Sequence, residues 1–172
     1  LGYQSGKEKF QLPDGRWVID NLKVSYYALN PEVSTNKWPS EVDLSTYYTA
    51  LTSVMSEVGI AVMEKIGLIG EQTGIHYDNA PRVCRMLYYK KSDGLENENS
   101  YWCGAHFDHD LLTGILPAFY FSDDVQIEEP LEAGLFIRTH EGQPYKKIIA
   151  NDYDVMMFQV GEFGQLATND RI

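Results

Sequence analysis

The sequence predicts an α+β fold built mainly from β-strands, either an antiparallel jelly-roll or a sandwich, with one long supporting helix. Across about residues 41–67, apolar residues recur at three- and four-residue steps, which is the period of an amphipathic helix. After about residue 80, short apolar runs alternate with turns rich in Asp, Glu, Pro and Gly, as strands do. Several short strands at near-regular spacing after a helical start favour a jelly-roll or sandwich.

The length and charge of the chain limit its organisation and partners. With 172 residues, of which 44% are hydrophobic, we expect a single domain over residues 1–172. The net charge of −11 argues against nucleic acid or an anionic membrane as partner, because both repel an acidic surface. The sequence contains no apolar run of about 18 residues and no signal-type segment. Cys84 and Cys103 do not form closely spaced pairs, so reduced thiols and a cytoplasmic location are expected.

Residues 1–40 combine turn formers with aromatic side chains, as at Pro13-Asp14-Gly15 and Trp17. Such a segment covers the body of a domain more often than it forms a helix or sheet of its own, and we expect a covering segment here. Its basic residues, among them Lys23, are candidates for contacts with a substrate carboxylate. A solvated surface is the commoner role of such residues.

The predicted helix covers about residues 41–67, and the segment 41–70 includes its C-terminal turn. Ser40 followed by Asp43 is a candidate cap for its start, and Gly67 or Gly70 is a candidate for its end. A long helix of this kind packs against one face of a sheet, so a scaffold role is expected. The apolar stripe, expected to face the core, consists of Leu44, Tyr47, Tyr48, Leu51, Val54, Met55, Val58, Ala61, Val62 and Ile66.

Residues 80–172 carry the expected jelly-roll strands. Each run is rich in apolar, β-branched or aromatic residues, and each is bounded by turn formers. The predicted strands are 82–89, 101–107, 111–121, 134–139, 145–150 and 155–160, with a polar loop over 93–100.

One short motif in this region has the residue types of a metal site. If residues 101–107 form a strand that continues to Asp108, the side chains of His106 and Asp108 leave the same face. An imidazole and a carboxylate side by side form two thirds of the 2-His-1-carboxylate triad that binds Fe(II). Chance alone predicts about 0.6 His-x-acid matches in this composition. The second match, His76 and Asp78, lies in a polar, turn-like run and is interpreted as a surface loop.

The context of His106 resembles a known family. Residues 104–108, Gly-Ala-His-Phe-Asp, followed by Leu-Leu-Thr at 111–113, resemble the iron-binding segment of the isopenicillin-N-synthase-like branch of the 2-oxoglutarate/Fe(II)-dependent dioxygenases. Further stretches resemble other motifs of this family in the same order, and together they cover about residues 80–172. They are Arg-Met-Leu-Tyr-Tyr at 85–89, Gly-Leu-Phe-Ile at 134–137, Gly-Gln-Pro-Tyr at 142–145 and Val-Gly-Glu-Phe-Gly-Gln-Leu-Ala-Thr-Asn-Asp at 160–170.

The resemblance implies a fold and an activity. The fold would be the double-stranded β-helix, or jelly-roll. The protein would be a non-haem iron oxidoreductase in which His106 and Asp108 are metal ligands and catalytic residues, and in which Tyr89 contacts the cosubstrate 2-oxoglutarate. The reaction would consume dioxygen and oxidise, usually by hydroxylation, an unactivated C–H bond of a small molecule.

The chain also departs from the family pattern. The family's second metal histidine and the basic residue that pairs with 2-oxoglutarate follow the 160–170 turn, and here both would lie beyond Ile172. We therefore expect the sequence to be part of a longer protein, incomplete at both ends. Leu87, Lys90 and Glu162 stand where the family has Asn, Pro and Asp. The first two of these differences weaken the assignment of Tyr89.

Two other histidines are candidates for the third ligand. His109 directly follows Asp108, so on a strand it would point to the opposite face, and a polar rim is the expected position. The composition around His140 predicts a solvated hairpin tip. Neither position favours metal binding.

Two alternatives to the dioxygenase stay open at the level of the sequence. One is a related Fe(II) oxidase with the same fold and triad that does not use 2-oxoglutarate. The other is a non-catalytic jelly-roll binding module, in which His106 and Asp108 form an ordinary buried hydrogen-bonded pair.

Overall fold

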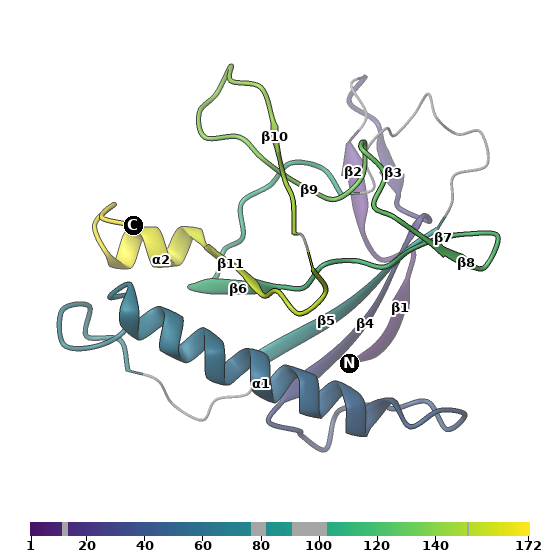
Figure 1. Ribbon diagram of the computed structural model, residues 1–172, viewed down its shortest axis with the longest axis horizontal. Helices are drawn as coiled ribbons and strands as arrows, with labels where there is room; N and C mark the ends of the chain where they lie inside the picture. Colours follow the sequence, from purple (N-terminus) through teal and green to yellow (C-terminus); the bar gives the residue numbers. More distant parts are fainter. Residues whose placement is uncertain (12–13, 77–81, 91–102, 151) are drawn as a thin grey trace. The chain divides into compact units, whose positions relative to one another are not determined.

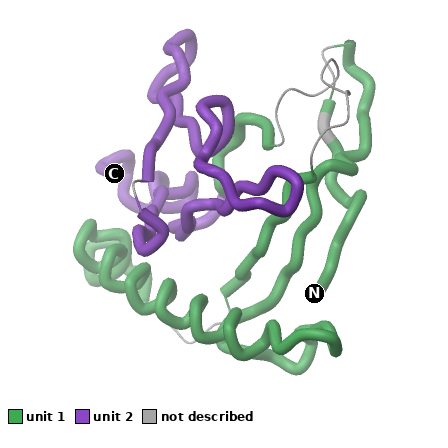
Figure 2. Tube along the Cα trace, turned by 45° about the vertical axis from the view of Figure 1, so that its right-hand side comes forward, with its two compact units in different colours: residues 1–108 green, residues 109–172 purple. Residues whose placement is uncertain are grey.

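The computed structural model describes residues 1–11, 14–76, 82–90, 103–150 and 152–172 (Figure 1). This part of the chain contains antiparallel strands and two helices, which confirms a β-rich α+β fold. The chain divides into two compact units, residues 1–108 and residues 109–172 (Figure 2). The predictions of a jelly-roll and of a single domain stay predictions. None of the described helices is long and apolar enough to cross a membrane.

The first unit is built on a three-stranded antiparallel sheet with the order β1-β4-β5. Its strands are β1 (Gly2–Ser5), β4 (Lys23–Asn30) and β5 (Arg82–Tyr89). The register pairs Ala28 with Cys84 and Lys23 with Tyr89. Strand β5 has the predicted bounds of 82–89.

The prediction that residues 1–40 only cover the domain is wrong, because they supply β1, the central strand β4 and a hairpin. The hairpin consists of β2 (Lys9–Gln11) and β3 (Trp17–Ile19), and Gly15 in its turn has a φ of 87°. Strand β4 contains Val24 and two tyrosines, residue types that favour strands. Strand β4 is hydrogen-bonded to β1 on one edge and to β5 on the other, and this pairing stabilises it although turn-forming residues flank it.

Helix α1 (Leu44–Lys65) confirms the predicted helix. The Asp43 carboxylate accepts a hydrogen bond from the Thr46 backbone N–H, at 3.2 Å, and so satisfies one free donor of the first turn. Gly67, with a φ of 75°, follows the last turn in a conformation that glycine adopts without strain. The helix runs beside the sheet (Figure 1), and Asn30 of β4 donates a hydrogen bond to the Thr52 hydroxyl, at 2.8 Å.

Only part of the apolar stripe of α1 is covered. The buried helix residues are Tyr48, Thr52 and Gly59. The prediction that Tyr47 faces the core is wrong, because it is 76% exposed, and Met55 is half-buried. Neighbouring helix residues are about 100° apart around the axis, so a stripe that includes both Tyr47 and Tyr48 is wider than the line of contact with one strand.

The second unit contains paired short strands. Strand β6 (Leu112–Ile115) pairs with β11 (Met157–Val160), β7 (Tyr120–Ser122) with β8 (Val125–Ile127), and β9 (Leu135–Ile137) with β10 (Lys146–Ile148). A short helix, α2 (Glu162–Ala167), follows β11.

Several predicted strands differ from the structure. The predicted strand 111–121 is two strands, β6 and β7, with Pro117 between them, where the missing N–H prevents continued pairing. Strand β8 was not predicted, and its turn uses Asp123 and Asp124, both with positive φ. Of the predicted strand 101–107, residues 103–107 are irregular, and residues 101–102 lie outside the described residues.

Candidate functional site

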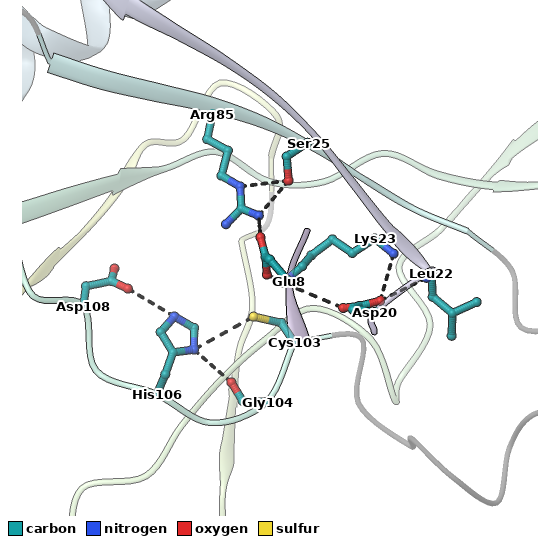
Figure 3. A network of polar contacts seen from close by, with 10 residues as sticks. All are labelled: Glu8, Asp20, Leu22, Lys23, Ser25, Arg85, Cys103, Gly104, His106 and Asp108. Carbon is teal, nitrogen blue, oxygen red and sulfur yellow. Dashed lines mark hydrogen bonds and ion pairs between the residues drawn. The ribbon is translucent and has the colours of Figure 1, made fainter. Parts of the chain in front are cut away.

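His106 and Asp108 lie side by side in an irregular segment of the first unit. The Nε2 atom of His106 is 3.1 Å from Oδ1 of Asp108, and the two side chains are 56% and 21% exposed. The proximity predicted from the sequence is therefore confirmed, although the strand geometry from which it was predicted is wrong. The backbone bends between the two residues and brings their side chains together (Figure 3).

A hydrogen bond fixes the other side of the imidazole. Nδ1 of His106 is 2.8 Å from the carbonyl oxygen of Gly104. A carbonyl only accepts, so Nδ1 carries the proton, and in the neutral ring the lone pair is then on Nε2, the atom that faces Asp108. Histidines that bind metals usually donate their second ring N–H to a carbonyl or carboxylate in this way.

The spacing of the pair fits a shared metal ion. Two donor atoms bound at right angles, each at about 2.1 Å from a metal, are about 3.0 Å apart. The separation of Nε2 of His106 and Oδ1 of Asp108, 3.1 Å, matches this value. Within the described ranges, no group of three or more His, Cys, Asp or Glu side chains is placed to hold a metal. The pair therefore offers one nitrogen and one oxygen donor, and no third such side chain joins it within these ranges.

Tyr89 ends strand β5 and is half-buried. Burial, with a smaller contribution from Cys103 and against the lowering effect of Arg85, raises the pKa of Tyr89 to about 12. The phenol is therefore neutral at physiological pH and able to donate a hydrogen bond. The Sγ atom of Cys103 lies 3.9 Å from Nδ1 of His106. Cys103 is thus near both Tyr89 and His106.

Cys84 and Cys103 are both free thiols, as expected. Cys84 is half-buried, and burial raises its pKa. Cys103 is exposed in an irregular segment, so the prediction that it lies within an apolar strand is wrong.

A cluster of charged side chains lies on the sheet face opposite to α1. Because side chains alternate along a strand, Lys23 and Ser25 of β4 share this face with Arg85 and Tyr89 of β5. The Arg85 guanidinium donates to the Ser25 hydroxyl, with Nε at 3.0 Å and Nη2 at 2.6 Å, and lies 4.9 Å above the ring of Tyr27.

Glu8 connects the two cations of this cluster (Figure 3). Its Oε1 pairs with Nη2 of Arg85, and its Oε2 pairs with Nζ of Lys23. Asp20, whose carboxylate accepts the backbone N–H groups of Leu22 and Lys23, lies 3.9 Å from the same Nζ. Burial raises the pKa of Glu8, but the hydrogen bonds and charges of Lys23 and Arg85 together lower it below its ordinary value.

Sequence reasoning missed this cluster. The expectation of a solvated surface is wrong for Lys23, whose side chain is only 8% exposed. The sequence pattern predicts no role for Glu8 or Asp20, and it includes Arg85 only in the Arg-Met-Leu-Tyr-Tyr motif at 85–89. The available signal was a charged residue inside each of two apolar strand-like runs, since such residues need a partner when they are buried.

The other three histidines, among the described residues, do not belong to a group of side chains that could hold a metal. In the second unit, Nδ1 of His109 pairs with the Glu162 carboxylate, and the His109 side chain is 88% exposed. His140 is exposed in the connection between β9 and β10, which confirms the predicted hairpin tip. His76 is exposed, as expected, and Asp78 lies outside the described residues.

Comparison with known proteins found no matching family model, no matching curated protein and no matching solved structure. A functional assignment therefore depends on the residues of this chain.

Proposed function

We propose that the protein is a cytoplasmic Fe(II)- and 2-oxoglutarate-dependent dioxygenase with a jelly-roll fold that oxidises an unactivated C–H bond of a small molecule. The observation that carries this proposal is the position of His106 between two oxygen atoms. Its Nδ1 faces the Gly104 carbonyl at 2.8 Å, and its Nε2 lies 3.1 Å from the Asp108 carboxylate. This arrangement places one nitrogen and one oxygen donor side by side.

In this proposal, Nε2 of His106 and Oδ1 of Asp108 hold the iron. The Gly104 carbonyl keeps the proton on Nδ1, so the lone pair remains on the ligating nitrogen. The carboxylate contributes a negative charge that offsets part of the charge of the cation. Bound iron, with 2-oxoglutarate and dioxygen, supplies the oxidising power for C–H cleavage.

Tyr89 has a binding role in this proposal. Its raised pKa keeps the hydroxyl protonated, so that it donates a hydrogen bond to a carboxylate of 2-oxoglutarate. A phenolate would instead repel the dianionic cosubstrate.

The test uses the full-length protein with His106→Ala and Asp108→Ala. Each variant removes one ligand, so Fe(II) binding by calorimetry and succinate formation from 2-oxoglutarate should both be lost. The matched controls are His140→Ala and Asp152→Ala, which remove the same residue types at exposed positions and should leave both measurements unchanged. Unchanged iron binding and turnover in either ligand variant would overturn the assignment.

A related iron oxidase that does not use 2-oxoglutarate is the second candidate. It is favoured by Leu87 and Lys90, which flank the tyrosine pair in place of the family's Asn and Pro. Substrate-dependent consumption of dioxygen without release of succinate would identify this activity.

A further inference from the structure

The cluster on the sheet face opposite to α1 has the form of a carboxylate bound by two cations. Each oxygen of the Glu8 carboxylate pairs with a different cation, Oε1 with Arg85 and Oε2 with Lys23. The Ser25 hydroxyl supports the guanidinium at 2.6 Å. The Lys23 side chain is 8% exposed and that of Arg85 is 30% exposed, whereas Glu8 is the most exposed of the three, at 40%.

We propose that Lys23, Arg85 and Ser25 form a binding subsite for a carboxylate group of the substrate, and that Glu8 occupies this subsite until the substrate displaces it. That this carboxylate belongs to a substrate rests on the dioxygenase function proposed above, whereas the binding of a carboxylate at this site does not. The inference extends that function by assigning the substrate to the organic acids.

The charges of the cluster require an anion at this position. With Glu8 in place, two carboxylates, those of Glu8 and Asp20, balance the two cations. With Glu8 turned away, Lys23 retains only Asp20, at 3.9 Å, and Arg85 retains only the neutral Ser25 hydroxyl among the contacts of this cluster. Without Glu8 the partly exposed Arg85 lacks a carboxylate partner in this cluster, so a carboxylate that replaces Glu8 restores the two-cation geometry.

Glu8 is placed to leave without unfolding the sheet. It lies in the short connection between β1 and β2, outside both strands. Its backbone carbonyl accepts a hydrogen bond from the Asp20 N–H, at 2.9 Å, which anchors the main chain. The connection also lines a small cavity of about 10 Å³, together with Lys23 and Ser25, enough for about one water molecule. Rotation of the side chain into solvent is therefore sufficient.

The subsite is close to the candidate iron ligands. Tyr89 pairs with Lys23 in the sheet register, lies on the same sheet face as Arg85 and is near Cys103. Cys103 in turn lies 3.9 Å from the His106 ring, and all of these residues belong to the first unit. A substrate anchored by its carboxylate at Lys23 and Arg85 would extend its carbon chain along the face that carries Tyr89.

The experiment measures binding of propionate to the full-length protein after removal of metals with a chelator. Glu8→Gln removes the competing charge at nearly constant volume and should tighten propionate binding by about tenfold, because the internal competitor is lost. Asp14→Asn is the matched control, because Asp14 lies in the turn between β2 and β3 and pairs with Arg16, outside the cluster. It changes the net charge by the same amount and should leave the affinity at the wild-type value.

The loss of binding is tested by Arg85→Gln in the Glu8→Gln background, which should return the affinity to the wild-type value or weaker. If thermal unfolding shows that Glu8→Gln is poorly folded, Glu8→Asp replaces it, because a side chain shortened by one methylene competes less well. Equal affinities of the Glu8 and Asp14 variants, or no effect of Arg85→Gln, would overturn the proposal.

A second measurement distinguishes substrate from cosubstrate as the source of the carboxylate. Succinate formation is followed against 2-oxoglutarate concentration in iron-loaded Arg85→Gln protein. Because Arg85 affects Tyr89 only indirectly in this proposal, the KM for 2-oxoglutarate should change by less than about threefold, whereas a rise of about tenfold would assign the subsite to the cosubstrate and overturn the proposal. Because the propionate assay needs no iron, its failure is distinct from failure of the dioxygenase function.

Discussion

Nε2 of His106 lies 3.1 Å from Oδ1 of Asp108, although neither residue belongs to a strand. A bend in the segment holds the two side chains together, and the hydrogen bond from His106 to Gly104 fixes the ring. In the proposed iron site, this hydrogen bond would orient the ring before the metal binds and so reduce the entropy cost of binding.

The charge of Asp108 is expected to matter for iron binding as much as its size does. Asp108→Asn keeps the shape but removes the negative charge, so the affinity for Fe(II) should fall by at least about tenfold, because hard cations prefer charged oxygen ligands. Calorimetric titration with Fe(II) under anaerobic conditions measures this change. An affinity equal to that of the wild type would show that Asp108 is not a ligand.

The Glu8 cluster should make stability depend on acidic pH. The pKa of Glu8 in the folded protein lies below its ordinary value of 4.5. The ionised carboxylate therefore stabilises the fold fully above pH 4.5, and this stability is lost as the pH falls through the lowered pKa. Urea unfolding should show wild type more stable than Glu8→Gln near neutral pH, with a gap that narrows in acid. A gap independent of pH would contradict the ion pairs.

Tyr48 should tolerate loss of its hydroxyl. Its oxygen is buried and has no hydrogen-bond partner in the described part of the chain. Burial is also the main reason that the pKa of Tyr48 is raised. Tyr48→Phe should leave the free energy of unfolding unchanged or raise it by about 1 kcal/mol, since no hydrogen bond is lost. Tyr47→Phe, at an exposed position, is the control, and a clear loss of stability in Tyr48→Phe alone would reveal a partner for the hydroxyl.

Gly161 should be intolerant of a side chain. A Cβ atom at this position would clash with the backbone carbonyl of Asp110, the same oxygen that accepts a hydrogen bond from the Gly164 N–H. Gly161→Ala is expected to destabilise the second unit by about 1–3 kcal/mol. Thermal unfolding measures the effect. Gly104→Ala serves as the control, because a Cβ there meets nothing within 4 Å, and equal melting temperatures for the two variants would contradict the close approach.

The amino-acid sequence by itself determined the elements that depend on local interactions. Helix α1 begins after the capping residue Asp43 and ends shortly before Gly67, as these residue types indicate. Strand β5 follows from a mostly apolar and aromatic run, Arg82–Tyr89, in which Arg85 is the one charged interior residue. His140 lies at an exposed connection because its neighbours are turn formers.

Tertiary structure decided what depends on residues far apart in the chain. Glu8 and Arg85 are 77 positions apart, and their contact exists only because β4 pairs with β5 beside the connection that carries Glu8. The same pairing buries Lys23, which the sequence pattern placed in solvent. Local composition determines whether a segment prefers a helix, a strand or a turn. Burial and ion pairing depend instead on which segments the fold brings together, and this is determined by strand pairing across the whole sheet.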